Sequence, residues 1–388
     1  MHLKAIETIT WIQGIRMSNE LEIKGFDFVE FYVGSAKMVA YWYAKALGFD
    51  ILAYQGPETG FKDRSSYYLK QNDINIVITS PLSPSFWQAT YFLNLHGDGV
   101  KRFAYQVSDV ENLYNHALNS GGIPVYKPTL DKDDNGQVLH AALKIYDDTE
   151  IVLCDRSQYK GLFMPGYDQP RQKISIERQA VGLKKIDHIV GNVRQNEMNA
   201  WADYFVRAFN FEQFIEFGPG DISTQYSALL SKVVKSHDFA IRNPINEPYE
   251  GKRKSQIEEY LDVYHGSGVQ HVALESDDIL TSIQALRNNG VEFLTVPQTY
   301  YDDLKKRNPG IVTEDIDALA DLGILCDIED LAGGEGYLLQ LFTKPIGDRP
   351  SFFYEIIQRR KGSQGFGQGN FQALFEAIER DQALRGNL

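Results

Sequence analysis

The chain has 388 residues, of which 43% are hydrophobic and 23% are charged, and its formal net charge is -13 at pH 7. This composition is typical of a folded globular protein with two or three domains. The acidic balance argues against the basic surface that binding to nucleic acid or to anionic membranes requires.

The first 25 residues contain no continuous apolar segment and carry Glu7, Glu20 and Glu22, so we expect no signal or transit peptide. No run of 18 apolar residues occurs, and we therefore expect no membrane span. Cys154 and Cys326 are too few for a disulfide framework and do not have metal-binding spacing. These features favour a cytoplasmic protein with no nucleic-acid or membrane partner.

An internal repeat organises the chain. Residues 25–49 and 185–211 both read as a strand, a polar turn and a helix. In each helix, apolar residues at positions i, i+3, i+4 and i+7 predict one buried stripe: Val39, Trp42, Tyr43 and Ala46 in the first, and Trp201, Tyr204, Phe205 and Ala208 in the second.

A second match aligns residues 103–123 with residues 271–291 without a gap, pairing Ser108 with Ser276 and Gly122 with Gly290. The sequence therefore predicts an α+β tandem duplication of strand and helix units. We expect an N-terminal domain at 1–160 and a C-terminal domain at 181–388. The connector is the Gly, Pro and polar-rich segment 157–180.

Two histidines distinguish the copies. In this alignment His188 corresponds to Phe28, and His271 corresponds to Phe103. A single histidine on an apolar strand is usually a core residue, but two at repeat-related positions, both absent from the other copy, favour a metal site.

Glu355 is the candidate third ligand, because it lies among Phe and Ile residues where an unpaired carboxylate has a large desolvation cost. Arg359 and Arg360 are alternative partners for it. The nearly equal spacing of His188, His271 and Glu355 instead indicates one ligand on each of three comparable strands. The matching stretch of the first half, 149–156, has an apolar residue near the equivalent position. Two imidazoles and one carboxylate suit non-haem Fe(II), although zinc or manganese could occupy the same set.

Five ordered stretches carry a resemblance to a known family: residues 187–192, 243–261, 268–274, 336–359 and 364–379. With them the C-terminal half resembles the 4-hydroxyphenylpyruvate dioxygenase family, and weaker likeness extends back to about residue 25. The resemblance implies the vicinal oxygen chelate fold, with tandem βαβββ modules forming two open-barrel domains and a C-terminal lid helix. The apolar counterparts of both histidines in the first half also lead us to expect an N-terminal domain without metal ligands.

The same resemblance implies Fe(II) held by His188, His271 and Glu355, with Val190 beside the first histidine. It further implies substrate contacts from Ser231, Asn246, Gln256, Gln270, Gln340, Phe342, Phe353, Phe366, Asn370 and Phe371.

Strand alternation tests part of this set. Gln340 and Phe342 are two residues apart, as are Phe353 and Glu355, so each pair faces one side of its strand. Gln270 directly precedes His271 and would face the opposite side unless the strand bulges or begins there.

The tail, residues 362–381, has four glycines followed by a helix with Asn370 as candidate N-cap. Its apolar stripe consists of Phe371, Leu374, Phe375 and Ile378. The segment is either a docked terminal helix or a lid in which Phe366, Asn370 and Phe371 close over the substrate. The glycines favour the lid.

The activity implied by the resemblance is conversion of 4-hydroxyphenylpyruvate and O2 to homogentisate and CO2, a step of tyrosine catabolism. It combines oxidative decarboxylation, ring hydroxylation and side-chain migration. The alternatives are 4-hydroxymandelate synthase, an extradiol catechol dioxygenase, and a non-catalytic binding protein of the same fold. We also expect a homo-oligomer, a dimer or tetramer, with the N-terminal half available as an interface.

Overall fold

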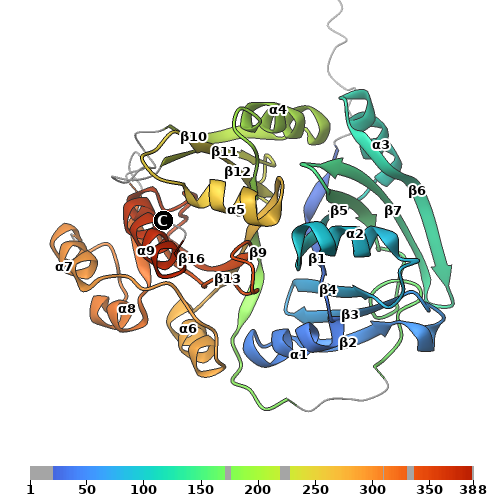
Figure 1. Cartoon of the computed structure of the whole chain (residues 1–388), viewed down its shortest axis with the longest axis horizontal. Coiled ribbons are helices and arrows are strands. Elements are labelled where there is room, and N and C mark those ends of the chain that lie inside the picture. The colour runs from blue at the N-terminus through green and yellow to red at the C-terminus, as the bar shows by residue number, and fades with distance from the viewer. Residues whose placement is uncertain (1–20, 171–175, 219–227, 309, 330–335, 387–388) are drawn as a thin grey trace, which may run out of the picture.

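The computed structural model describes residues 21–170, 176–218, 228–308, 310–329 and 336–386. Within them, each half of the chain forms one curved eight-stranded sheet (Figure 1). The strand orders are β2-β3-β4-β1-β5-β8-β7-β6 and β10-β11-β12-β9-β13-β16-β15-β14. Because the two orders match strand for strand, the predicted duplication is confirmed.

The first sheet contains two βαβββ modules. The first module comprises β1 (Ile23–Tyr32), α1 (Ala36–Ala46), β2 (Asp50–Gln55), the short 3-10 helix η1 (Pro57–Thr59), β3 (Arg64–Gln71) and β4 (Ile74–Pro81). Helix α2 (Trp87–His96) leads to the second module, which comprises β5 (Gly99–Val107), α3 (Val110–Asn119), β6 (Ile123–Asp133), β7 (Gly136–Ile145) and β8 (Thr149–Asp155).

The second sheet repeats this order. Its first module comprises β9 (Leu183–Asn192), α4 (Met198–Phe209), β10 (Glu212–Phe217), β11 (Ala228–Lys235) and β12 (Arg242–Tyr249). Helix α5 (Gln256–Tyr264) precedes β13 (Gly268–Ser276), α6 (Ile279–Asn288), α7 (Gln298–Arg307), α8 (Ile316–Leu322), β14 (Leu325–Ile328), β15 (Tyr337–Phe342) and β16 (Phe353–Arg360). The chain continues with η2 (Gln368–Asn370) and α9 (Phe371–Leu384), which lies against the second sheet (Figure 1). None of the helices in the described part of the chain is long and apolar enough to cross a membrane.

Strand pairing corrects our alignment of the halves by one residue. Strand β1 pairs with β5 so that Glu30 lies opposite Arg102, whereas β9 pairs with β13 so that Val190 lies opposite His271. The counterpart of His271 is therefore Arg102 rather than Phe103. The error arose after the strand, where Ser276 is followed by two aspartates.

Helix caps agree with the corrected alignment. Asp109 caps α3 by accepting from the Asn112 amide, and Asp278 caps α6 by accepting from the Thr281 amide. The sequence comparison had paired Asp109 with Asp277. Beyond the helices, Gly121 and Gly290 both adopt positive φ, +93° and +100°, a backbone conformation that favours glycine.

One hydrophobic core joins the two halves across the helix-covered faces of the sheets. The rings of Phe31 and Phe352 pack edge to face with centroids 5.0 Å apart, and the Tyr43 and Tyr354 hydroxyls lie 3.1 Å apart. The N-terminal half thus supports β16, the strand that carries Glu355.

The concave face of the first sheet is filled by its own side chains. Phe163, from the segment after β8, stacks on Tyr68 with ring centroids 4.4 Å apart and packs edge to face on Phe28 at 5.4 Å. A β-bridge between Tyr54 and Asp168 continues this packing. The composition-based connector therefore begins as part of the N-terminal core.

A hydrogen bond between the halves gives a stability prediction. The Tyr105 hydroxyl donates to Asn243 Oδ1 over 2.6 Å in a buried position. Tyr105→Phe leaves that oxygen unpaired, which should lower the free energy of unfolding by about 1–3 kcal/mol. Thermal and denaturant unfolding measure the change. Tyr41→Phe, at a side chain that is 47% exposed, is the control and should leave stability within about 0.5 kcal/mol of the parent. Equal stability of all three proteins would contradict the prediction.

Candidate metal and substrate site

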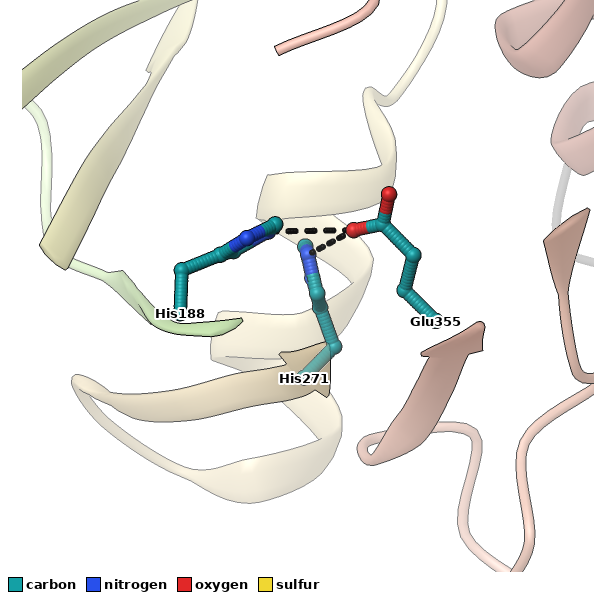
Figure 2. Close-up of side chains that lie close together, drawn as sticks. All are labelled: His188, His271 and Glu355. Atoms are coloured by element: carbon teal, nitrogen blue, oxygen red, sulfur yellow. Dashed lines mark ion pairs between the residues drawn. The ribbon is translucent and has the colours of Figure 1, made fainter. Parts of the chain in front are cut away.

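Three neighbouring strands bring two imidazoles and one carboxylate together. Strand β13 lies between β9 and β16, and its Ala273 pairs with both His188 and Glu355, while His271 lies two residues earlier on the same face. The methyl group of Ala273 leaves the space between the two longer side chains open. The triad therefore converges because of strand register (Figure 2).

The ligand atoms of the triad lie within metal-binding reach of one another. His188 Nε2 is 3.0 Å and His271 Nε2 is 3.5 Å from Glu355 Oε2. The three candidate ligand atoms, one from each residue, all lie within 4.8 Å of one another, and all three side chains are buried. These two nitrogens and one oxygen leave coordination positions open for other ligands, which fits a catalytic divalent metal.

Both imidazoles are oriented through their second nitrogen. His188 Nδ1 donates to Asp187 Oδ1 over 2.7 Å, and His271 Nδ1 donates to Gln270 Oε1 over 2.9 Å. Each bond holds its ring so that Nε2 points to the centre of the site, towards Glu355 Oε2. Sequence reasoning missed Asp187, although its position next to a candidate ligand was a usable signal.

The arginines following Glu355 have other partners. Arg359 binds Asp187 through Nε and Nη2, each at 2.8 Å, and Arg360 binds Glu314 at 2.8 Å. The alternative in which these arginines neutralise Glu355 by direct pairing is therefore wrong.

A cavity opens beside the triad, and the triad residues form part of its wall. Of the residues that the resemblance implies, it is lined by Val190, Ser231, Asn246, Gln256, Gln270, Phe342, Phe353, Phe366 and Phe371. Gln270 reaches the cavity together with His271 because the β9 and β13 ladder shifts register between Val269 and His271.

Part of the cavity wall was not predicted. It consists of Phe217, Leu229, Val233 and Pro244. Leu229, Ser231 and Val233 alternate along β11, so an inward-facing Ser231 already implied that its two neighbours would face inward as well.

Two predicted substrate residues are not part of the wall. Gln340 is buried under the loop at Gly367, where a Cβ would meet its side-chain nitrogen at 2.2 Å. Asn370 precedes α9 as the N-cap residue but makes no capping bond, and its Oδ1 instead accepts from the Tyr300 hydroxyl over 2.6 Å. Substrate contact by either residue stays a prediction.

Helix α9 closes one side of the cavity with the stripe that the sequence predicted. Phe371, Leu374, Phe375 and Ile378 all line it. Phe366 adds a ring 5.2 Å from that of His188, and Phe353 stacks on His271 with ring centroids 4.8 Å apart. The site is therefore an aromatic and aliphatic chamber with one polar, metal-binding corner.

The metal-free triad holds an ion pair. Burial opposes ionisation of Glu355, but the positive charge of His188 and hydrogen bonds from both histidines lower its pKa to about 2. Burial lowers the pKa of His271. For His188 burial acts in the same direction, but Glu355 and Asp187 outweigh it and raise the pKa. These shifts favour the neutral form of His271 and the protonated form of His188, so a metal competes with a proton mainly at His188.

This difference predicts pH-dependent metal binding. Because the pKa of His188 is raised, protons compete with the metal up to a higher pH than for an ordinary histidine. Affinity should rise about tenfold per pH unit below that pKa and level off above it, since one proton is displaced. Titration with Co(II) between about pH 5.5 and 8.5 measures the slope. A flat profile would contradict displacement of a proton.

Two family models match the chain. The N-terminal hydroxyphenylpyruvate dioxygenase (HPPD) domain matches residues 17–168, and the glyoxalase, bleomycin resistance protein and dioxygenase superfamily matches residues 185–317. The second match supports the vicinal oxygen chelate fold.

Similar proteins cover nearly the whole chain. 4-Hydroxyphenylpyruvate dioxygenase of Aspergillus fumigatus is 44% identical over 96% of both chains. The enzyme of Xenopus tropicalis is 42% identical over 94% of this chain and 92% of its own. The enzyme of Dictyostelium discoideum is 43% identical over 94% of this chain and 100% of its own.

Among solved structures, a triple mutant of 4-hydroxymandelate synthase from Streptomyces coelicolor superposes with a TM-score of 0.80 at 27% identity, covering 93% of this chain and 99% of that one. A xylose isomerase-like TIM barrel/4-hydroxyphenylpyruvate dioxygenase fusion protein has a TM-score of 0.72 at 25% identity, covering 94% of this chain and 53% of that one. The full-length sequence similarity, the duplicated fold and the buried triad agree, and the chain belongs to the 4-hydroxyphenylpyruvate dioxygenase family of metal-dependent enzymes.

Proposed function

We propose that the chain holds Fe(II) with His188, His271 and Glu355 and converts 4-hydroxyphenylpyruvate and O2 to homogentisate and CO2. The observation that carries this proposal is the buried triad in the wall of a chamber of aromatic rings and amides. When bound, Fe(II) offers open positions for the carboxylate and keto oxygens of the substrate and for O2, and it carries the redox chemistry.

Charge supports an anionic substrate at this metal. Among the described residues that line the cavity there is no lysine or arginine, and Glu355 is the one carboxylate. A divalent metal with that carboxylate leaves one net positive charge, which matches the single carboxylate of a 2-oxo acid. In an acidic chain, the site thus attracts its substrate through the metal rather than through a basic patch.

The side chains of the cavity position the substrate and exclude water. Phe353, held flat against His271, and Phe342 and Phe371 offer faces and edges for an aromatic ring. Ser231, Asn246, Gln256 and Gln270 offer donors and acceptors for the phenol or the carboxylate.

The reaction balances without a second 2-oxo acid. The bond between the keto carbon and the carboxylate breaks and CO2 leaves. One oxygen atom of O2 enters the new side-chain carboxylate and the other becomes the new ring hydroxyl, while the side chain migrates to the neighbouring ring carbon. All electrons come from the substrate, so no 2-oxoglutarate is consumed.

The test is an aerobic assay of Fe(II)-loaded protein with 4-hydroxyphenylpyruvate that follows O2 uptake and identifies the product by chromatography and mass. Homogentisate is the expected product. The structural likeness to 4-hydroxymandelate synthase makes that activity the second candidate, and hydroxymandelate would identify it. Oxidation of catechols without CO2 release would indicate an extradiol enzyme, and ligand binding without any turnover would indicate a binding protein.

We propose in addition that the two domains predicted at 1–160 and 181–388 are the folding units, with the first continuing to about Asp168, and that metal binding is confined to the second. We also propose a cytoplasmic homo-oligomer, a dimer or tetramer. Both cysteines are free and buried, which suits a reducing compartment. Met38, Trp87 and Tyr91 are exposed on the N-terminal half and offer apolar area for an interface. Analytical ultracentrifugation determines the number of subunits.

A further inference from the structure

Asp187 joins the metal-binding corner to the loop that covers it. Its carboxylate is buried and receives a two-pronged bond from Arg359, with Nε and Nη2 each at 2.8 Å. Oδ1 also accepts from His188 Nδ1, and Arg242 Nη1 lies 3.7 Å from Oδ2. Arg359 Nη1 in turn donates to the Gly365 carbonyl over 2.7 Å, next to Phe366.

Comparison of Asp187 with its counterpart in the first half, Asp27, distinguishes a structural role of the carboxylate from a role at the metal site. In the first half Asp27 and Arg156 form the same pair, and Arg156 lies over the Phe163 ring as Arg359 lies over Phe366. The residue after Asp27, however, is Phe28, which has no nitrogen to orient.

The aspartate and arginine pair is therefore a structural element of both barrels. Only in the second half does its carboxylate also contact an imidazole. The contact with His188 thus gives Asp187 a direct route to the metal site that Asp27 lacks.

We propose that Asp187 is a positioning residue that fixes the tautomer and ring orientation of His188 for metal binding, and that Arg359 holds Asp187 in place. The inference rests on the proposed metal site. A carboxylate that accepts from the second ring nitrogen of a metal-binding histidine pins the ring and increases its basicity, and loss of such a partner typically costs about 10–100-fold in metal affinity.

The experiment compares Asp187→Asn with the matched control Asp27→Asn. Each protein, loaded anaerobically with Fe(II) or with Co(II) as an oxygen-stable substitute, is titrated for stoichiometry and affinity, and the visible absorption of bound Co(II) reports the geometry. We expect Asp187→Asn to bind about 10–100-fold more weakly and to alter the Co(II) spectrum. Asp27→Asn should change affinity less than about threefold and leave the spectrum unchanged, even if both lose similar thermal stability.

Arg359→Lys keeps a positive charge beside Asp187 but loses the planar two-pronged bond, so it should weaken metal binding by about threefold or more. This variant serves as the test if Asp187→Asn does not fold. Equal losses in the Asp187 and Asp27 variants, or unchanged affinity in the Asp187 and Arg359 variants, would overturn the inference. A parent protein that binds no metal, or that binds it equally well after His188→Ala, would overturn the proposed function and this inference together.

Discussion

Replacing Glu355 with glutamine removes metal binding and turnover but not the fold. Glu355 is the one anionic group of the triad, and its Oε2 lies 3.0 Å and 3.5 Å from the two imidazole nitrogens. A neutral amide is a much weaker ligand for a divalent cation than a carboxylate. Loss of a residue that only hydrogen-bonds to a metal ligand typically lowers metal affinity by about 10–100-fold. Loss of the ligand itself should therefore lower metal affinity and kcat/KM by more than about 100-fold.

The fold should tolerate this change, because glutamine has nearly the same shape as glutamate and His188 keeps Asp187 as a buried partner for its Nδ1. Metal affinity is measured by anaerobic Fe(II) titration and turnover by the homogentisate assay. Stability is measured by thermal unfolding of the metal-free protein. Val152→Ala is the matched control, since Val152 pairs with Ala104 as Glu355 pairs with Ala273. It should lower stability and leave the metal bound. Full metal occupancy at parental affinity in Glu355→Gln would contradict the ligand assignment.

The duplicated fold and the triad could be predicted because the two halves of the sequence can be aligned with each other. Strand and helix patterns recur in both halves, and His188 and Glu355 stand where the first half has the apolar Phe28 and Val152. His271 was also identified as a candidate ligand, but it was aligned with Phe103 instead of Arg102. The alignment matched the serines at the ends of the two strands, Ser108 and Ser276, and not the N-cap aspartates of the following helices, Asp109 and Asp278.

The structural counterpart of His271 shows what occupies this position in the first half. Arg102 lies between Glu30 at 3.2 Å and Glu150 at 3.4 Å, and its Nη2 donates to the Tyr32 hydroxyl over 2.9 Å. At the position of His271, the first half thus has a partly buried arginine between two carboxylates, whereas the second half has an imidazole beside a single carboxylate.

Other features could not be predicted because they depend on register and on contacts between distant segments. The bulge that turns Gln270 inward is a property of two paired strands and leaves no signal in the alternation of β13 alone. The pairing of Asp187 with Arg359 joins residues far apart in sequence. Helices α7 and α8 interrupt the fourth module, and the repeat gave no template for them because α3 leads directly to β6 in the first half.

Replacing Phe366 with alanine lowers kcat/KM by about 100-fold while the metal stays bound. The ring lies 5.2 Å from that of His188 and forms part of the cavity wall, so its loss admits water and frees the substrate ring to move, and small misplacements at a reacting centre cost factors of this size. The ratio of O2 consumed to homogentisate formed should rise above one.

Phe163→Ala is the matched control, since Phe163 contacts Phe28 as Phe366 contacts His188. It should lose about 3–5 kcal/mol of stability but keep the parental kcat/KM in assays below its unfolding temperature. Unchanged kinetics and O2 stoichiometry in Phe366→Ala would show that the segment is a docked terminus and not a lid.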